Sequence, residues 1–311
     1  MSSFEPAYIK TFENGLLKEK ISKAYNLLRA CVLCPRKCGV DRMSGDTGTC
    51  KTAERAWVSS YNPHFGEEEP LVGIHGSGTI FFTHCNLLCT FCQNFDISHH
   101  ANGRQVSDGE LAGIMLSLQN RGCHNINFVT PSHVVPQILS AVESAVPRGL
   151  SIPLIFNTGG YDRITTLKLL DGVIDIYMPD FKFWDSQVAE ITCRAVDYPK
   201  VVQKALMEMH RQVGDLQIDD AGIARRGLLI RHLVLPNGMA GTRKIMRFIA
   251  QHISSDSYVN IMSQYRPCGR AAEVKKLDSH LLPQEYHMAV DAAKREGITR
   301  LDQPRRMFRF R

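Results

Sequence analysis

The chain has 311 residues, of which 44% are hydrophobic and 22% are charged, as is ordinary for a soluble globular protein with a sizeable core. No apolar run approaches the roughly 18 residues of a membrane span, and Met1–Lys10 lacks the pattern of a signal peptide. The formal net charge is +6, partly concentrated in a C-terminal run with Arg305, Arg306, Arg309 and Arg311. This run reads as a solvated tail or a phosphate-binding patch, without a nucleic-acid motif beside it. We therefore expect a cytoplasmic protein with neither a membrane nor a nucleic acid as partner.

The chain contains ten cysteines, which in a reducing compartment indicate metal binding or catalysis rather than a disulfide framework. Seven of them fall into two clusters, and Cys123, Cys193 and Cys268 are dispersed.

The N-terminal part begins with a helix predicted over residues 15–30, where apolar residues recur at helical spacing. Residues 31–75 are expected to be loop-rich, with too few apolar residues to hold a fold alone. This stretch contains the first cluster, C-x2-C-x3-C-x11-C, formed by Cys31, Cys34, Cys38 and Cys50. Four thiolates can close a tetrahedral zinc site or complete an iron–sulfur cluster, so we expect a metal to stabilise this extension.

From residue 76 onward, short apolar strands alternate with helices. Strands are predicted at 79–83, 125–129, 152–157, 173–178, 227–235 and 258–263, and helices at 107–122, 134–146, 164–170, 201–213, 243–253 and 284–295. Ser107 and Glu110 form a capping box at the first of these helices. Right-handed crossovers make such units into a parallel sheet with helices outside.

Six units are too few to close an eight-fold barrel, so the expected fold is α/β with an open, partial (β/α)6 barrel over residues 76–300. Residues 1–75 form the expected N-terminal helical and cysteine-rich extension, and residues 301–311 the basic tail. In such folds the chemistry lies at the C-terminal ends of the strands.

The second cysteine cluster follows the first of these strands directly, in "THCNLLCTFCQNF" (residues 83–95). Cys85, Cys89 and Cys92 have the spacing C-x3-C-x2-C, and closely spaced thiolates favour a soft metal or an iron–sulfur cluster. A four-iron cluster held by three cysteines keeps one iron free of protein ligands, which marks a reactive site. Coincidence, a zinc site completed by a histidine (His84, His99 or His100), and an electron-transfer cluster completed by a distant cysteine are the alternatives.

The cysteine spacing, Phe91 before the last cysteine and the six strand–helix units resemble the radical S-adenosylmethionine (radical SAM) superfamily. More narrowly, residues 76–267 are similar to proteins related to the activating enzyme of pyruvate formate-lyase, in "FNTGGYD", "PDFK", "RHLVLPN" and "QYR". The resemblance implies that a reduced [4Fe-4S] cluster cleaves SAM into methionine and a 5′-deoxyadenosyl radical, which removes hydrogen from a substrate. It also implies an electron donor such as flavodoxin or ferredoxin.

The resemblance places the cofactor-binding residues at the strand ends: Phe91, Thr130, Ser132, Asn157, Asp180, Lys182, Arg231 and Gln264. The family's Gly-Gly-Glu after the second strand is replaced by "VTPSH" (residues 129–133), so Thr130, Ser132 or backbone carbonyls are expected to accept the hydrogen bonds of the SAM amino group. Asp180 and Lys182 could instead pair only with each other. Arg231 is either a buried ion pair or a carboxylate clamp.

These departures leave the substrate open among a peptide, a protein and a small molecule. The expected function is therefore a radical SAM enzyme. One alternative is an activase that installs a glycyl radical on a partner enzyme, and another is a non-catalytic iron–sulfur electron-transfer protein.

Overall fold

The computed structural model describes residues 4–302, and its centre is a sheet of mostly parallel strands. Six parallel strands follow one another in chain order across the sheet: β2 (Ser77–Phe82), β4 (Ile126–Val129), β5 (Leu154–Thr158), β6 (Ile176–Pro179), β8 (Ala224–Leu233) and β9 (Tyr258–Met262). The expected α/β architecture with six strand–helix units is thus confirmed at the level of a parallel sheet with its crossover helices.

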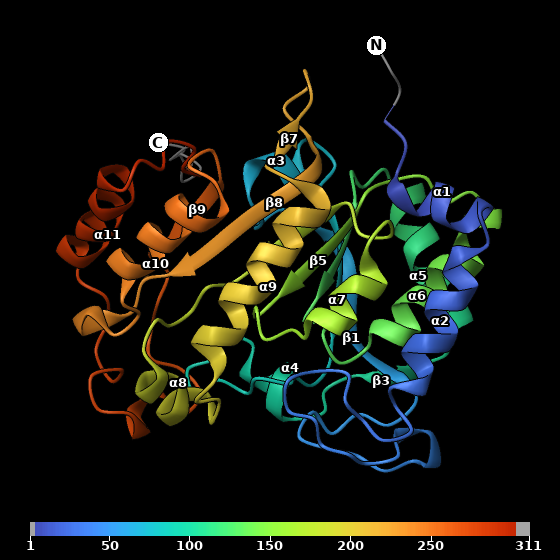
Figure 1. The fold of residues 1–311 in the computed structure, drawn as a ribbon, viewed down its shortest axis with the longest axis horizontal. Helices are drawn as coiled ribbons and strands as arrows, with labels where there is room; N and C mark the ends of the chain where they lie inside the picture. The colour runs from blue at the N-terminus through green and yellow to red at the C-terminus, as the bar shows by residue number, and fades with distance from the viewer. Residues whose placement is uncertain (1–3, 303–311) are drawn as a thin grey trace, which may run out of the picture.

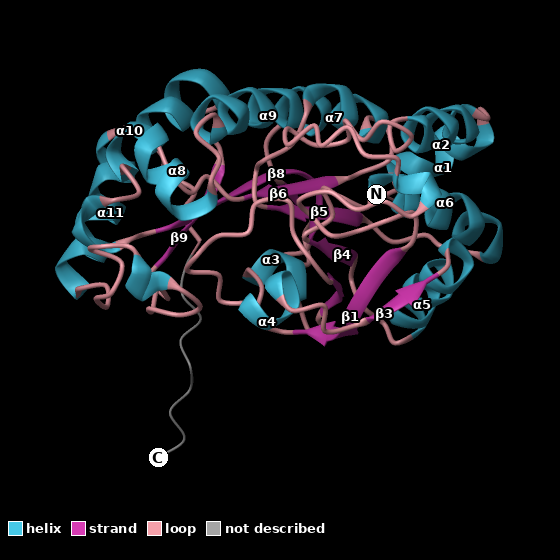
Figure 2. Ribbon diagram, turned by 90° about the horizontal axis from the view of Figure 1, so that it is seen from below, coloured by secondary structure: helices cyan, strands magenta, loops and turns pink. Residues whose placement is uncertain are grey.

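The helices that follow the six parallel strands cover one face of this sheet. They are the crossover helices α5 (Asp108–Asn120), α6 (Val135–Ala145), α7 (Ile164–Leu170), α9 (Tyr198–Val213) and α10 (Thr242–Phe248), and α11 (Pro283–Arg295) after the last strand. Figure 1 shows α7 and α9 packed in front of the strands, and in Figure 2 the helices form an outer arc around a curved sheet. The short helices α3 (Glu69–Val72) and α4 (Phe95–His99) lie on the inner side of this arc.

The predicted capping box is present at the start of α5. The Ser107 hydroxyl accepts a hydrogen bond from the Glu110 N–H at 3.2 Å, and the Glu110 carboxylate accepts one from the Ser107 N–H at 2.8 Å. The two residues satisfy each other's backbone donors, which is why the helix starts where the pattern predicts.

Several elements depart from the sequence prediction. The expected loop at residues 31–75 contains strand β1 (Ala56–His64), which pairs antiparallel with β2 and, at its other edge, with β3 (Arg104–Val106). Only the first residues of β1 alternate between buried and half-buried positions, so its sequence pattern is weak. The predicted 15–30 helix is α2 (Leu16–Asn26), preceded by α1 (Ala7–Glu13), and α8 (Ser186–Cys193) and β7 (Gln217–Ile218) were not predicted.

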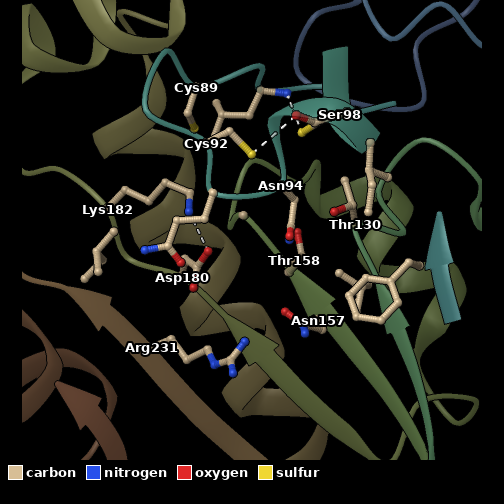
Figure 3. A pocket seen from close by; sticks show the side chains of 18 of the residues that line it. Cys89, Cys92, Asn94, Ser98, Thr130, Asn157, Thr158, Asp180, Lys182 and Arg231 are labelled. Carbon is tan, nitrogen blue, oxygen red and sulfur yellow. Dashed lines mark hydrogen bonds and ion pairs between the residues drawn. The ribbon is translucent and has the colours of Figure 1, made fainter. Parts of the chain in front are cut away.

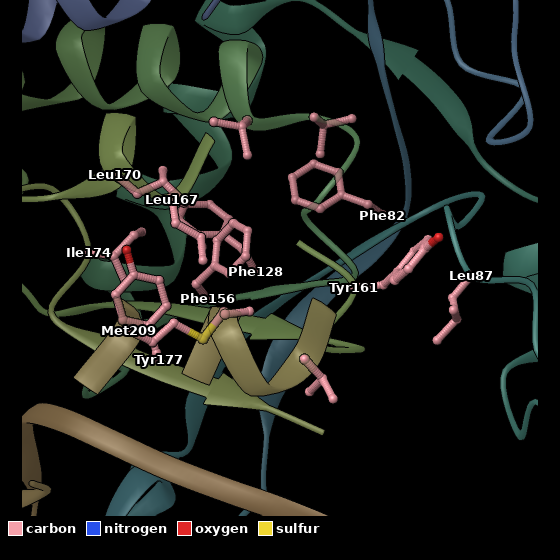
Figure 4. Close-up of a cluster of buried hydrophobic side chains, with 14 of the residues drawn as sticks. Phe82, Leu87, Phe128, Phe156, Tyr161, Leu167, Leu170, Ile174, Tyr177 and Met209 are labelled. Carbon is pink, nitrogen blue, oxygen red and sulfur yellow. The ribbon is translucent and has the colours of Figure 1, made fainter. Parts of the chain in front are cut away.

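The core fills the space between the sheet and the helices. Phe128, Phe156 and Tyr177, on three adjacent parallel strands, lie in one cluster with Leu167 of α7 and Met209 of α9 (Figure 4), and the rings of Phe156 and Tyr177 meet edge to face. All five side chains are fully buried. Each contributes on the order of 1.5–3 kcal/mol by leaving water, so the middle of the sheet is a firm support for its strand ends.

A buried carboxylate ties the N-terminal helix to the sheet. The Oδ1 atom of Asp175 accepts a hydrogen bond from the N–H of Ala7 at 2.8 Å, and Oδ2 accepts one from the N–H of Leu154 at 3.0 Å. Burial outweighs these bonds and raises the pKa of Asp175 to about 7.

This raised pKa makes stability depend on pH. The folded chain holds a proton on Asp175 that an unfolded aspartate, with a pKa of about 3.9, has lost. Stabilisation by this proton is complete below about pH 4 and is lost as pH rises through about 7. The free energy of unfolding of wild type minus that of Asp175→Asn should fall by about 1.4 kcal/mol per pH unit in this window. Urea denaturation across the window measures the difference, and a flat profile would contradict the assignment.

None of the described helices is both long and apolar enough to cross a membrane. The basic residues Arg305, Arg306, Arg309 and Arg311 lie outside the described residues.

Candidate functional site

A cavity of about 370 Å³ lies at the C-terminal ends of the parallel strands. Every one of the six strands, or the residues directly after it, contributes to its lining: Phe82, Cys85, Cys89 and Cys92 from β2 and its loop, Thr130 after β4, Asn157 and Thr158 of β5, Asp180 and Lys182 after β6, Arg231 and Leu233 of β8, and Met262 and Gln264 of and after β9. The structure thus brings most of the candidate residues predicted from the sequence into one cavity (Figure 3).

The loop after β2 places three thiols in this cavity. Burial raises the pKa of Cys85 to about 12 and also raises that of Cys92, with the Cys89 thiol adding to both shifts. The Sγ atom of Cys193 donates a hydrogen bond to that of Cys89 at 3.3 Å. This hydrogen bond and burial together raise the pKa of Cys89 well above its ordinary value. These three thiols, of which that of Cys89 belongs to a buried residue and the other two to partly exposed ones, are poor acids as they stand, and a bound cation would reverse this.

The backbone around this loop is strained at the cavity wall. His84 and Leu88 adopt positive φ angles of 72° and 55°, and Thr130, across the cavity, has φ 61°. A left-handed conformation is a genuine outlier for a β-branched residue such as Thr130. Outliers that the surrounding structure enforces cluster at functional sites.

Asp180 and Lys182 form an ion pair beside the cysteine loop. The Lys182 Nζ atom lies 2.5 Å from Oδ2 of Asp180, and both side chains are mostly buried. Burial by itself would lower the pKa of Lys182, but Asp180 and then Cys89 raise it well above its ordinary value. Behind this pair, Gly160 has φ 77°, and a Cβ atom there would lie 2.5 Å from the Asp180 carbonyl oxygen. The turn after β5 therefore requires glycine to hold the pair in place.

Arg231 forms a mostly buried ion pair, which agrees with one of its two predicted roles, and it also lines the cavity. Its guanidinium lies 2.6 Å from Oε2 of Glu67 and 2.7 Å from Oε1 of Glu68, two residues that the sequence analysis did not select. Burial by itself would lower the pKa of Arg231, but Glu68 and Glu67 outweigh it and raise that pKa. Asn260 also donates to Glu68, and His64 lies 3.3 Å from Glu67. The only feature of the sequence that could have indicated these partners of Arg231 is the run of three consecutive glutamates at 67–69.

The remaining predicted residues divide between the cavity and its surroundings. Phe91 is buried in the cavity wall, 5.8 Å from the Phe183 ring and edge-on to it. Gln264 lines the cavity next to the cysteine loop, where its carbonyl oxygen accepts a hydrogen bond from the Gln93 side chain at 2.8 Å. Asn157 accepts the Thr130 N–H through its carbonyl oxygen at 2.9 Å. Ser132 does not line the cavity.

Ser132 is instead buried behind the strand ends. Its hydroxyl lies 2.9 Å from that of Thr158, which donates to Asp162 at 2.7 Å. Ser132 supports the wall, so Thr130 and backbone carbonyls remain as acceptors on that side of the cavity.

The N-terminal cysteines form a second group of neighbouring thiols. Cys31, Cys34 and Cys50 are buried and Cys38 is partly exposed. Burial raises the pKa of Cys34 to about 12, and the thiols of Cys50, Cys31 and Cys38 add to this shift.

Arg36, inside this first cysteine cluster, connects it to the second. Its guanidinium donates to the carbonyl oxygens of Asn86 and Leu87 in the cavity loop at 2.8 and 3.2 Å. It also donates to the carbonyl oxygens of Cys193, at 2.7 Å, and Arg194 at the end of α8. One side chain thus holds three segments of the chain together.

Two of the three histidines considered as zinc ligands contact residues other than the cysteines. His84 Nδ1 lies 3.2 Å from the Thr52 hydroxyl, and His99 stacks on Phe95 with ring centroids 3.9 Å apart. Within residues 4–302, no three side chains among His, Cys, Asp and Glu are already gathered in the geometry of a bound metal ion. Cys268, one of the dispersed cysteines, lies beside the loop and donates to the Phe91 carbonyl oxygen at 3.2 Å.

The fold and site define a mixed α/β protein with a cysteine-lined cavity at the ends of its parallel strands. No protein-family model matches the chain. It is similar to "Uncharacterized protein MJ0674" of Methanocaldococcus jannaschii, with 31% identity over 292 residues that cover 91% of this chain and 80% of the archaeal protein. The chain belongs to the same family as this archaeal protein.

Proposed function

We propose that the protein is a radical SAM enzyme, in which Cys85, Cys89 and Cys92 hold a [4Fe-4S] cluster and the cavity beside them binds SAM. The observation that carries the proposal is the location of these three thiols on one loop at the ends of six parallel strands, lining one cavity that also contains polar side chains. When bound and reduced, such a cluster supplies the electron that splits SAM into methionine and a 5′-deoxyadenosyl radical, which then takes hydrogen from a peptide, protein or small-molecule substrate. In this proposal the curved parallel sheet is the partial barrel of the superfamily.

The residues present fit a cluster of this kind. Thiolates are the usual ligands of iron–sulfur clusters, and three of them leave one iron for another ligand. Ser98 donates to Cys92 Sγ at 3.3 Å, and the Leu87 N–H donates to Cys85 Sγ at 3.3 Å. Hydrogen bonds of this type to ligand sulfurs tune a cluster and orient its ligands.

The other cavity residues would bind and orient SAM. Thr130 and Asn157 offer polar groups on one wall, and the Asp180–Lys182 pair offers a carboxylate and an ammonium group next to the thiols. Apolar residues such as Phe82, Leu233 and Met262 complete the lining and limit access of water. A radical formed in such a site is protected from side reactions with solvent.

Reconstitution with iron and sulfide under anaerobic conditions, reduction with dithionite and quantification of 5′-deoxyadenosine test the proposal. We expect product formation after SAM is added, together with a change in the electron paramagnetic resonance spectrum of the reduced cluster. A fully reduced cluster that neither changes its spectrum nor forms product would exclude this function.

A second candidate, an electron-transfer protein, is favoured by one contact. Cys193 Sγ lies 3.3 Å from Cys89 Sγ and could provide a fourth thiol that closes the site. The same titration separates the candidates, because SAM leaves the spectrum of a cluster with four cysteine ligands unchanged.

We also propose that Cys31, Cys34, Cys38 and Cys50 bind a second metal, either zinc or an iron–sulfur cluster. The support is their burial and mutual proximity in a segment with few apolar contacts of its own. Elemental analysis of the purified protein and of a Cys34→Ser variant would identify the metal, and equal metal content in both would contradict the assignment.

A further inference from the structure

A second hollow of the surface, a groove of about 1310 Å³, lies apart from the cysteine cavity. Its walls are α8, α10 and α11, and two short segments, at residues 236–239 and 275–276, complete it. The proposed function assigns no role to this groove.

The rim of the groove is positively charged. Five exposed basic side chains surround it: Arg243, Lys244, Lys275, Lys276 and Arg295. Within residues 4–302, only Arg243 among them forms an ion pair, with Glu296 at 3.6 Å. The groove also contains three acidic residues, of which two are engaged by backbone N–H groups.

Two of these three acids, Asp185 and Glu285, have structural roles, while Asp291 also lines the groove. Five basic against three acidic side chains leave the lining with a net excess of positive charge. Asp185 caps α8 by accepting from the N–H groups of Gln187 and Val188, at 2.7 and 3.1 Å. Glu285 accepts the N–H groups of Asn237 and Leu282. Four of the five basic side chains form no ion pair within residues 4–302, and the net positive charge of the lining favours association with an acidic surface through electrostatic steering.

Apolar side chains line the same groove as the basic ones. Ile191 of α8 is 55% exposed and Met288 of α11 is 70% exposed. An apolar centre with a charged rim is the usual composition of a protein-binding surface. Lys276, with φ 79°, is held in position by Asn237, which donates to its carbonyl oxygen at 3.0 Å.

The groove and the cysteine loop share α8. Ile191 faces the groove, and Thr192, the next residue, accepts the Thr90 N–H through its carbonyl oxygen at 2.9 Å. Cys193 then contacts Cys89. Two residues thus separate the groove wall from a thiol of the loop, and Figure 1 shows α8 and α4 along the same edge of the molecule.

We infer that the groove docks a small acidic electron-transfer protein, which reduces the cluster by one electron and is itself oxidised by one. This inference rests on the proposed cluster at Cys85, Cys89 and Cys92. The positive charge of the groove favours an acidic partner. The short path along α8 from Ile191 to Cys193, which contacts Cys89, favours electron transfer from a protein bound in this groove.

The test compares a groove variant, Lys244→Glu with Lys275→Glu, with a matched control, Lys10→Glu with Lys18→Glu. The control residues are also exposed lysines, and they lie on α1 and α2 at the other end of the molecule (Figure 1). The readout is the rate at which reduced recombinant flavodoxin bleaches the visible absorbance of the reconstituted cluster, measured by anaerobic stopped flow. Dithionite, a small chemical reductant, serves as the second electron source.

We expect the groove variant to react with flavodoxin about tenfold or more slowly than wild type at low salt, and at the wild-type rate with dithionite. The control should match wild type with both reductants. Equal flavodoxin rates for the groove variant and the control would overturn the inference. Self-association of the wild type that the groove variant has lost, measured by analytical ultracentrifugation, would also overturn it, because the groove would then be an interface between two copies. Because the readout is cluster reduction, absence of 5′-deoxyadenosine would refute the proposed enzyme without deciding the docking site.

Discussion

Replacing Cys89 by alanine is expected to reduce 5′-deoxyadenosine formation to the background of a sample without protein. The loop holds three thiols, and removal of one leaves two, too few for a stable cluster with an open iron. The loss should exceed the 10–100-fold that is typical when only an outer-shell partner of a metal is removed. Iron content per chain should fall in parallel.

Cys123→Ala is the matched control for this prediction. Cys123 is buried to a similar degree, with 3% exposure against 7% for Cys89, but it lies just before β4, at the opposite end of the strand from the cavity. The control makes the same cysteine-to-alanine change outside the cavity, so it should retain the wild-type iron content and the wild-type amount of 5′-deoxyadenosine. A Cys89→Ala protein that retained both would remove the main support for the proposed function.

Replacing Arg231 by methionine is expected to destabilise the fold by about 3–5 kcal/mol, the cost of leaving buried charges without a partner. Glu68 has a fully buried side chain and Glu67 is 6% exposed, so water cannot take the place of the guanidinium. His64 would compensate part of the charge on Glu67, and Asn260 would keep its bond to Glu68. Urea denaturation followed by circular dichroism measures the change.

The control for this second prediction removes the charge of Arg231 and of both glutamates that pair with it. Arg231→Met combined with Glu67→Gln and Glu68→Gln removes the unpaired charges and should recover most of the lost stability, since buried ion pairs contribute little net free energy compared with neutral groups. A loss below about 1 kcal/mol in the single variant would mean that the carboxylates are solvated or protonated instead.

The sequence predicted those elements that are determined by neighbouring residues, through runs of apolar side chains or a helix cap. The six parallel strands are short apolar runs between helices, and α5 begins at a capping box, so both were located correctly. Strand β1 was missed because its alternation covers few residues and Pro63 lies within it. Helix α8 has the Asp185 cap as a signal, but its eight residues are too few for a clear periodicity.

The site was predictable where strand ends define it. Asp180, Lys182 and Asn157 follow or end strands, so the topology alone brings them together with the cysteine loop. The partners of Arg231 and Cys89 were not predictable, because Glu67 and Cys193 lie 164 and 104 residues away in the chain. Such pairs depend on how loops fold over the sheet edge, which leaves no local pattern.

The position of Arg36 has a consequence for the order in which the protein matures. Its guanidinium reaches the carbonyl oxygens of Asn86 and Leu87 only when the segment around Cys34 and Cys38 is folded against the loop that follows β2. The loop that carries Cys85 and Cys89 is therefore shaped in part by a residue of the upstream site. We expect metal loading to be sequential, with the upstream site filled first and the reactive cluster inserted afterwards, so that iron starvation would affect the two sites unequally.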